Sequence, residues 1–402
     1  MKFAIFSRSK IDLYGANPGE SDAQTEQKPT KAVSRLTAFV RKNTILVIAL
    51  AAAVATSFII PPDAAYLGYF DFKTLTCLFC VLAVVCAFKN INFFYLLARG
   101  IVKRFRNIRL CVIAVVYITF IGSMFIANDM ALITFLPLGY FVLSGTGNER
   151  WTALTFILQN ISANLGGMLT PFGNPQNLYL YTKYEIPAGE FVSIMALPFA
   201  VSIAIITACC FIVKPVEIEF PADNAAPLPK DKTIIYTLLF ALATAIVFRG
   251  IPYWVGLIVI PAVLLIVDRK ALKMVDYPLL GTFAAFFVFS GNMARIEPVR
   301  QFVSGLLGKN TLLFSILSCQ FISNVPSAIL LSQFTDNYRE LLIGVNIGGV
   351  GTLIASLASL ITFREYTKNY PKRTKQYILL FLLINFAFLL TLTIIMSLAL
   401  GK

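Results

Sequence analysis

The sequence contains no histidine among its 402 residues, and only 13% of them are charged. Histidine is the most frequent general base and metal ligand in proteins, so its absence removes the common metal sets and the nucleophile–base pairs that need an imidazole. The glycine-rich phosphate-binding pattern of ATP-using proteins is also missing from the sequence. We therefore expect neither an enzyme nor a protein with a resident cofactor.

Apolar residues take the place of charged ones in this composition. Hydrophobic residues make up 58% of the chain, and the mean hydropathy is +0.77. A soluble fold of this length could not bury so much apolar surface. The runs at residues 44–60 and 377–400 approach or reach the roughly 20 residues with which a helix crosses a hydrocarbon core. The alternation typical of membrane strands is missing, so the composition predicts an all-α polytopic membrane protein in a lipid bilayer.

Basic residues outnumber acidic ones by 34 to 20, which gives a formal net charge of +14. They are scattered through short connections between apolar runs, so they indicate membrane topology and not nucleic-acid binding. The seven cysteines lie in apolar runs, and we expect even Cys77 and Cys80 to serve helix packing. Residues 1–42 are polar and lack the apolar core of a secretory signal, which predicts a disordered cytoplasmic tail.

Placing the basic connections inside gives one consistent path through the membrane. The connections at 99–109, 268–273 and 364–375 are basic, whereas 61–71 carries only acids and belongs outside. The path puts the N-terminus in the cytoplasm and the C-terminus outside, in a plasma membrane of the bacterial inner-membrane type. Its nine crossings lie near residues 43–60, 72–88, 151–181, 190–213, 232–248, 253–268, 276–294, 339–363 and 376–400.

Two stretches, residues 109–147 and 310–334, do not fit as simple crossings. Each must leave and return on the same side if the charges are to stay consistent. Each is also interrupted by a polar cluster, "IANDM" at 126–130 and "ISNVPS" at 322–327. We predict re-entrant hairpins, because non-helical backbone at that depth is tolerated only where protein or a watery cavity satisfies it.

The two hairpins divide the chain into halves with the same order of segments. Each half has two spans, an amphipathic stretch (91–107 or 296–310), a hairpin, an interrupted span and a final span. The first half starts inside and the second outside, so we predict an inverted repeat formed by residues 43–213 and 253–402. Residues 214–252 then form a linker and a joining transmembrane helix. Such repeats with interrupted helices are typical of secondary transporters with a site near the midplane.

A duplicated motif, N-x-G-G-x-x-T, lies in the interrupted span of each half, at residues 164–170 and 346–352. Paired glycines let backbones approach closely, and a threonine offers its hydroxyl to an ion or a freed carbonyl. We predict two half-sites, although the glycines are equally typical of small-residue helix packing. The candidates are Asn164, Gly167, Thr170, Asn346, Gly349 and Thr352.

The residues after the motif differ between the halves, "PFGNPQN" at 171–177 against "LIASLAS" at 353–359. We expect substrate choice to depend on this asymmetric part, with Gly173, Asn174, Asn177 and Ser356 as candidates. No lysine or arginine enters the predicted site. A bound anion would therefore rely on helix N-termini, amides and a co-bound cation.

Asn128 and Asn324 lie at the two predicted hairpin turns, next to Asp129 and Ser323. Free N–H groups at such a turn attract anions, and free carbonyls ligate cations, so we predict Na⁺ at Asn128 and Asn324. Asp129 is the only carboxylate placed deep in the membrane. A charge there costs at least ~2.5–3.5 kcal/mol, which makes it a functional candidate. The alternative is that these residues only cap their half-helices.

These motifs resemble those of the ion transporter superfamily, which includes citrate transporters, divalent-anion/sodium symporters, arsenite permeases and sodium/proton antiporters. Residues 127–137 look like the first hairpin of arsenite-permease-type members. Residues 166–177 look like the broken-helix signature G-G-x-x-T-P-x-G-x-P-x-N of the dicarboxylate carriers. The resemblance implies two inverted repeats whose hairpins meet at a central site, often in a homodimer.

Both hairpin tips of the dicarboxylate symporters carry a Ser-Asn-Thr triplet that contributes to Na⁺ and carboxylate binding. This chain has Ala-Asn-Asp at 127–129 and Ser-Asn-Val at 323–325. The resemblance therefore implies a coordinating role for Asn128, Asn324 and Ser323, while dicarboxylate specificity stays open.

The leading hypothesis is an ion-coupled secondary transporter, driven by Na⁺ or H⁺, that moves a small anion or an oxyanion-like solute by alternating access. The second is an arsenite efflux permease or a sodium/proton antiporter in which Asp129 cycles a proton. A membrane enzyme or a receptor is disfavoured, because a receptor would not require both hairpins and both interrupted helices.

Overall fold

The computed structural model describes residue 40, residues 43–218 and residues 228–401. Regular structure in these ranges is helical, apart from an isolated bridge between Asn107 and Glu217. Ile45–Lys402 forms one compact unit, separate from Met1–Thr44. Except for residue 40, the predicted tail at 1–42 lies outside the described residues, as does the 219–227 part of the predicted linker.

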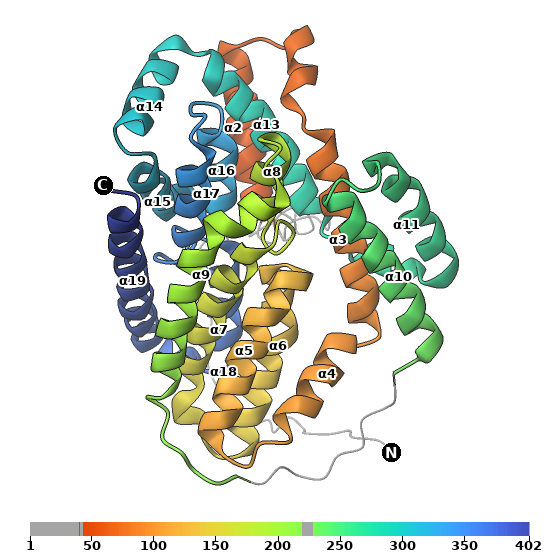
Figure 1. Cartoon of the computed structure of the whole chain (residues 1–402), viewed down its shortest axis with the longest axis vertical. Coiled ribbons are helices and arrows are strands. Elements are labelled where there is room, and N and C mark those ends of the chain that lie inside the picture. Colours follow the sequence, from red (N-terminus) through yellow and green to blue (C-terminus); the bar gives the residue numbers. More distant parts are fainter. Residues whose placement is uncertain (1–39, 41–42, 219–227, 402) are drawn as a thin grey trace, which may run out of the picture. The chain divides into compact units, whose positions relative to one another are not determined.

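The helices follow the predicted order of segments (Figure 1). Those of the first half are α2 (Thr44–Ile59), α3 (Phe72–Asn90), α4 (Phe93–Val102), α5 (Ile108–Ile126), α6 (Asn128–Gly145), α7 (Thr152–Gly166), α8 (Pro175–Lys183) and α9 (Ala188–Cys210). After α10 (Lys230–Val247) come α11 (Tyr253–Val267), α12 (Arg269–Met274), α13 (Tyr277–Arg295), α14 (Glu297–Lys309), α15 (Thr311–Ile322), α16 (Asn324–Leu331), α17 (Tyr338–Ile347), α18 (Leu357–Asn369) and α19 (Thr374–Ala399). Short 3₁₀ turns include η1 (Ala64–Tyr69) and η3 (Gly167–Leu169).

Within the described residues, five helical segments are long and apolar enough to cross a membrane: α3, α5, α9, α13 and Pro371–Ala399, which contains α19. Four of them coincide with predicted crossings, and α5 is an arm of the first predicted hairpin. The outer face of α19 exposes Leu379, Leu383, Leu390 and Ile394, as expected for a lipid-facing helix. These features confirm the prediction of an all-α polytopic membrane protein.

Each predicted hairpin consists of two helical arms joined at a single residue. Ala127 joins α5 to α6 with φ 61°, and Ser323 joins α15 to α16 with φ 77°. Positive φ is unfavourable for residues with a Cβ, so both turns depend on the surrounding contacts to hold them. The two turns have the same backbone geometry at equivalent places in the two halves.

Both spans that contain the duplicated motif are interrupted as predicted. In the first half, α7 ends at Gly166, and η3 and a loop lead to α8, whose first residue is Pro175. In the second half, α17 ends at Ile347, and Ser356 caps the start of α18 through Ser359 N–H. Glycine loosens both helix ends, and proline in the first half cannot donate a helical hydrogen bond.

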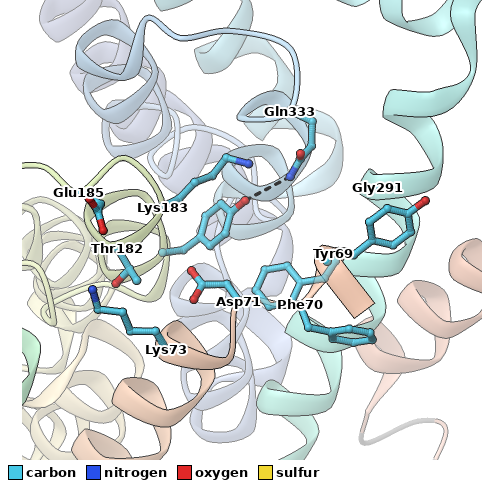
Figure 2. A pocket seen from close by; sticks show the side chains of 12 residues that line it. Tyr69, Phe70, Asp71, Lys73, Thr182, Lys183, Glu185, Gly291 and Gln333 are labelled. Carbon is cyan, nitrogen blue, oxygen red and sulfur yellow. Dashed lines mark hydrogen bonds between the residues drawn. The ribbon is translucent and has the colours of Figure 1, made fainter. Parts of the chain in front are cut away.

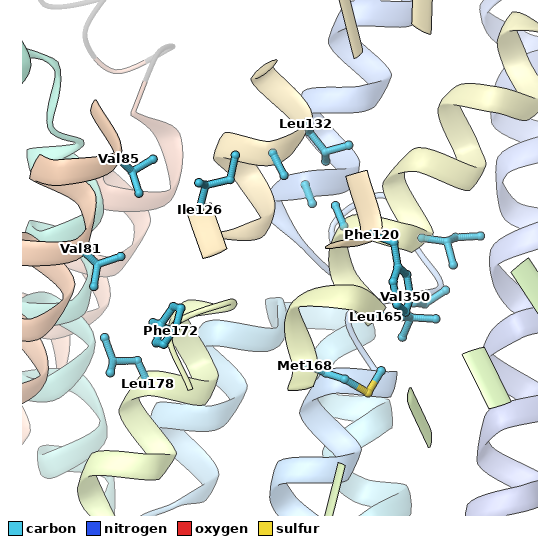
Figure 3. Close-up of a cluster of buried hydrophobic side chains, with 14 of the residues drawn as sticks. Val81, Val85, Phe120, Ile126, Leu132, Leu165, Met168, Phe172, Leu178 and Val350 are labelled. Carbon is cyan, nitrogen blue, oxygen red and sulfur yellow. The ribbon is translucent and has the colours of Figure 1, made fainter. Parts of the chain in front are cut away.

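The halves exchange their second half-helices. Helix α8 packs on α16 and α17 of the second half, and α18 packs on α6 and α7 of the first half. Figure 1 shows α8 beside α16 and α18 beside α7. The buried apolar cluster in Figure 3 includes Met168, Phe172 and Leu178 of the first broken helix, together with Ile126 of α5 and Val350 of the second half. The matched packing agrees with a repeat, and the inversion of the two halves stays a prediction.

The loops between helices contact one another, and each contact joins two loops that the charge pattern assigns to the same side of the membrane. On one side, Arg295 Nη2 lies 2.7 Å from Asp63 Oδ2 and Arg339 Nη2 lies 2.7 Å from Glu190 Oε1. On the other, Asn90 Nδ2 donates to Asp268 Oδ2 at 2.7 Å. The loops thus sort into two groups, as the predicted path requires, while which group faces the cytoplasm stays a prediction.

Candidate functional site

The two hairpin tips line one small cavity of about 40 Å³, which we call the central cavity. Asn128 and Asp129 reach it from the first hairpin, and Ser323 and Asn324 from the second. Pro175 and Leu357, the first residues of α8 and α18, also line it. A space of this size holds a bare ion or a few water molecules. The structure therefore brings together four of the predicted site residues.

Matching backbone hydrogen bonds hold the two tips against the broken helices. Asn128 N–H donates to Gly173 C=O at 3.1 Å, and Asn324 N–H donates to Ala355 C=O at 2.9 Å. Gly173 and Ala355 each lie two residues before the helix that follows, α8 or α18. Ser323 Oγ adds a 3.3 Å bond to the same Ala355 carbonyl. These bonds explain how two strained turns persist.

The two tip asparagines are buried, and their side chains act in the same way. Asn128 Oδ1 accepts from Asp129 N–H and Asn324 Oδ1 accepts from Val325 N–H, each at 2.9 Å. Asn128 Nδ2 donates further to Asn164 Oδ1 at 3.3 Å. Each tip asparagine thus accepts from a free N–H in the first turn of its helix and also lines the central cavity.

Asp129 lies in the first turn of α6, where the helix dipole favours a negative charge. Among the described residues, its buried Oδ1 has no hydrogen-bond partner. A carboxylate oxygen with a free lone pair beside a cavity suits either a small cation or a proton. Asp129 is also the acidic residue that lines the central cavity.

The two glycines of each motif have different surroundings. A Cβ on Gly166 would clash with Phe120 C=O of α5, and one on Gly348 would lie 2.8 Å from Cys319 of α15. A Cβ on Gly167 would instead clash with Asn174 Oδ1, and one on Gly349 would meet Asn324 Nδ2 at 2.9 Å. The first glycine permits helix packing, and the second leaves room for a polar side chain of the site.

The motif threonines contact the entering arms of the hairpins and are not among the residues that line the central cavity. Thr170 Oγ1 donates to Met124 C=O at 2.7 Å, and Thr352 Oγ1 donates to Gln320 C=O at 3.1 Å. Each acceptor lies four residues before the tip asparagine. The hydroxyls therefore satisfy carbonyls near the broken ends of α5 and α15.

Asn346 lies at the centre of a buried amide cluster that links the halves. Its Nδ2 donates to Asn177 Oδ1 at 2.6 Å, and its Oδ1 accepts from Asn174 Nδ2 at 3.2 Å and from Gln176 Nε2 at 3.4 Å. Asn174 Nδ2 also donates to Asn164 C=O at 3.0 Å. The predicted residues of the two interrupted spans thus meet directly.

Gln320 is a positioning residue that sequence reasoning missed. Its Nε2 donates to Gly348 C=O at 2.8 Å and to Val350 C=O at 3.2 Å, and its Oε1 accepts from Thr352 N–H at 2.9 Å. In the first half, Asn177 Nδ2 bonds carbonyls of the corresponding loop, those of Gly167, Met168 and Thr170, of which Met168 matches Val350. The signal that could have revealed Gln320 is a lone amide in an apolar run, four residues before Asn324.

Several buried acceptor oxygens near the amide cluster lack a donor among the described residues. Asn174 Oδ1, Gln176 Oε1 and Asn160 Oδ1 belong to this group, in addition to Asp129 Oδ1. Oxygen atoms without a donor are the ligands that a hard cation such as Na⁺ requires. Of the remaining candidates, Ser356 contacts Ser359 of its own helix, and Gly173 supplies its carbonyl to the first tip.

This arrangement defines a class, a polytopic helical membrane protein whose interrupted helices and hairpins surround a polar centre. A sequence model of the citrate transporter family matches residues 36–338, and the chain belongs to that family. The match includes both hairpin tips and the first broken helix, and residues 346–356 follow it.

Two relatives are described as a transporter and as an inner membrane protein. The uncharacterized transporter MJ0456 of Methanocaldococcus jannaschii is 33% identical over 308 residues, 74% of this chain and 82% of the relative. The inner membrane protein YbiR of Escherichia coli is 28% identical over 319 residues, 77% of this chain and 84% of the relative. The chain is a multi-pass membrane transporter.

Proposed function

We propose that this transporter is an ion-coupled secondary carrier of a small anion or an oxyanion-like solute, which moves its substrate by alternating access. The coupling ion is Na⁺ or H⁺. The observation that carries this proposal is the convergence of four helix starts, those of α6, α8, α16 and α18, on the central cavity. Helix N-termini attract anions, and among the described residues no lysine or arginine lines the cavity.

The chemistry of the central cavity supports joint binding of an anion and a cation. The N-termini attract the anion, while Asp129 and the unpaired amide oxygens supply negative partial charge for Na⁺ or a site for H⁺. The present volume of about 40 Å³ cannot hold a di- or tricarboxylate. Substrate entry therefore requires the hairpins to move away from the broken helices, which is the motion that alternating access needs.

Removal of the amide of Asn324 tests the site. We expect Asn324→Ala to reduce substrate-dependent flux in proteoliposomes by a factor of 100 or more, because the amide both shapes the second tip and faces the cavity. Citrate, succinate, sulfate, phosphate and arsenite would be screened under imposed Na⁺ and H⁺ gradients.

The matched control for this test is Asn385→Ala. Asn385 is also a buried asparagine, but its Nδ2 donates to Phe381 C=O of its own helix, α19, and it does not line the central cavity. Full flux in Asn324→Ala, with normal amounts of folded protein, would remove this residue from the site.

The carboxylate at the central cavity favours a second candidate, an arsenite efflux permease or a sodium/proton antiporter. Here Asp129 would take up and release the coupled proton. The change Asp129→Asn keeps the shape and removes the ionisable group, so it should erase the pH dependence of transport between pH 5 and 9. An unchanged pH profile would reject the proton-carrying role.

Three further parts of the proposal concern the chain in the membrane. We place the N-terminus in the cytoplasm and the C-terminus outside, on the charge pattern of the connections. The printed name of the Escherichia coli relative supports an inner-membrane location. A homodimer is proposed on the resemblance described above.

A further inference from the structure

A second and much larger cavity of about 390 Å³ lies at the other end of the helices that line the central cavity. Its walls come from η1, the start of α3, the end of α8, the middle of α13 and Gln333 after α16 (Figure 2). We call it the lysine cavity, because Lys73 and Lys183 line it. The family assignment and the predicted site residues do not explain it.

The two ammonium groups in this cavity form no ion pair with a described residue. Both lysines are half-buried, and neither has a carboxylate within 4.0 Å among the described residues. Lys183 Nζ lies 5.9 Å from the centre of the Tyr179 ring. Two unpaired positive charges in one partly enclosed space attract an anion, because the surrounding protein weakens solvent screening.

The acidic residues of the lysine cavity do not cancel this attraction. Asp71 caps α3, and its two carboxylate oxygens accept from Thr74 N–H at 2.9 Å and Thr74 Oγ1 at 2.5 Å. Glu185 is exposed. Asp71 is thus held in place as the cap of α3, and anion binding by the lysines breaks no ion pair of the described residues.

Tyr179 lines the lysine cavity and belongs to α8, whose first residue, Pro175, lines the central cavity. Its ring packs on Phe287 of α13 with centroids 5.6 Å apart, and its hydroxyl shares a hydrogen bond of 2.8 Å with Ser332 Oγ. Gln333 Nε2 donates to the same hydroxyl at 3.4 Å, the bond drawn in Figure 2. Along α8, Tyr179 is four residues from Pro175 of the central cavity, or about 6 Å. The Tyr179 side chain thus joins α8 to α13 and to the residues after α16, beside the lysine cavity.

We propose that the lysine cavity is an anion-binding station at which Lys73 and Lys183 hold a small carboxylate or oxyanion before it passes Tyr179 to the central cavity. This inference rests on the proposed function. The cavity has the volume for a di- or tricarboxylate that the central cavity lacks. The loops that line the lysine cavity lie on the same side of the membrane as the Asp63–Arg295 contact. The station is therefore open to the side that we predict to be external.

A cysteine reporter tests binding without requiring transport. Gly68 lines the lysine cavity, and a Cβ there would meet nothing within 4 Å, so Gly68→Cys should be tolerated. The half-buried Cys209 would be replaced by serine in the full-length purified protein. Citrate, succinate and phosphate, each at 1–10 mM, would then be tested for slower labelling of the reporter by a maleimide.

We expect at least one of these anions to slow labelling several-fold. The double change Lys73→Gln and Lys183→Gln should raise the half-protecting concentration roughly tenfold or more. A matched change, Lys309→Gln at the end of α14, should leave protection intact. Absence of protection by all three anions, or protection unaffected by the double change, would overturn the proposal.

The same protein separates this inference from the proposed function. In Asn324→Ala, labelling of Gly68→Cys should still be slowed by the anion although flux is lost. Protection without any anion flux in the unaltered protein would contradict the proposed function and leave the station standing. Anion flux without any protection of the reporter would contradict the anion-binding station and leave the proposed function standing.

Discussion

At the scale of single residues, the two glycines of each duplicated motif have different roles. Gly166 and Gly348 face the entering arms of their own hairpins, whereas Gly167 and Gly349 face asparagines. A motif in sequence marks both glycines of a pair as necessary. It does not distinguish them, because the distinction depends on which neighbour lies opposite each Cα hydrogen.

Gly166→Ala should destabilise the protein by about 1–3 kcal/mol, as overpacking does. The added Cβ meets Phe120 C=O, which is backbone and cannot turn away, so α5 and α7 must separate. The measurement is the apparent midpoint of thermal unfolding in detergent. Gly305→Ala in α14 is the control, because its Cβ would meet nothing within 4 Å. Equal midpoints for the two variants would contradict this packing role.

Gly349→Ala should reduce flux while changing the unfolding midpoint much less than Gly166→Ala does. Its Cβ meets the end of the Asn324 side chain, which rotates at low cost but then leaves its position at the central cavity. Flux and midpoint would be measured on the same preparations. A variant that is unstable yet fully active would show that Gly349 serves packing instead.

At the scale of elements, the two halves use different residues to satisfy the carbonyl groups where the broken helix is interrupted. In the first half, Asn177 at the start of α8 donates to these carbonyls, and in the second half Gln320 of α15 does so. The difference between "PFGNPQN" and "LIASLAS" is therefore partly structural. The first loop has its own amide, and the second depends on its hairpin.

Gln320→Leu should loosen the loop at 348–352, because two carbonyls and the Thr352 N–H lose their partner. We expect the Thr352 amide to exchange with deuterium about 10–100 times faster, which corresponds to the ~1–3 kcal/mol cost of unsatisfied buried groups. The exposed Gln301→Leu is the control. Unchanged exchange at Thr352 would show that Gln320 does not hold the loop.

Much of the arrangement of hairpins and interrupted helices could be predicted from the sequence. Polar clusters in apolar runs predicted the hairpins at 109–147 and 310–334, and glycine and proline predicted the interrupted spans. The exchange of α8 and α18 between the halves was not predicted, because it depends on contacts between residues far apart in the chain. The central cavity was predicted only in part. The tip residues were among the candidates, whereas Pro175, Leu357 and the role of Gln320 emerged from the packing.

At the scale of the whole molecule, the connections on each side of the membrane contact one another. One such contact is the exposed pair of Asp63 and Arg295, which ties the connection after α2 to the end of α13. The hydrogen bond from Arg295 holds the pKa of the Asp63 carboxyl below its usual value of about 3.8. Because the pair is exposed, its contribution to stability is small.

The pH dependence of this contribution has a definite sign. A carboxyl whose pKa is depressed in the folded state stabilises that state above its ordinary pKa and loses the effect as the pH falls through the depressed value. Asp63→Asn should therefore lower the unfolding midpoint slightly at pH 7 and not at all at pH 2–3. Asp231→Asn is the control, and a difference that grows at acid pH would contradict the pairing.

The bond between Asn346 and Asn177 joins residues that are 169 positions apart. During synthesis, the first interrupted helix enters the bilayer long before its partner leaves the ribosome. Until then, the buried amides of the first half have no protein partner from the second half, and unsatisfied amides in hydrocarbon are costly. The first half therefore reaches its final packing only after translation passes residue 346, so a chain that stops earlier is expected to be degraded by membrane quality control.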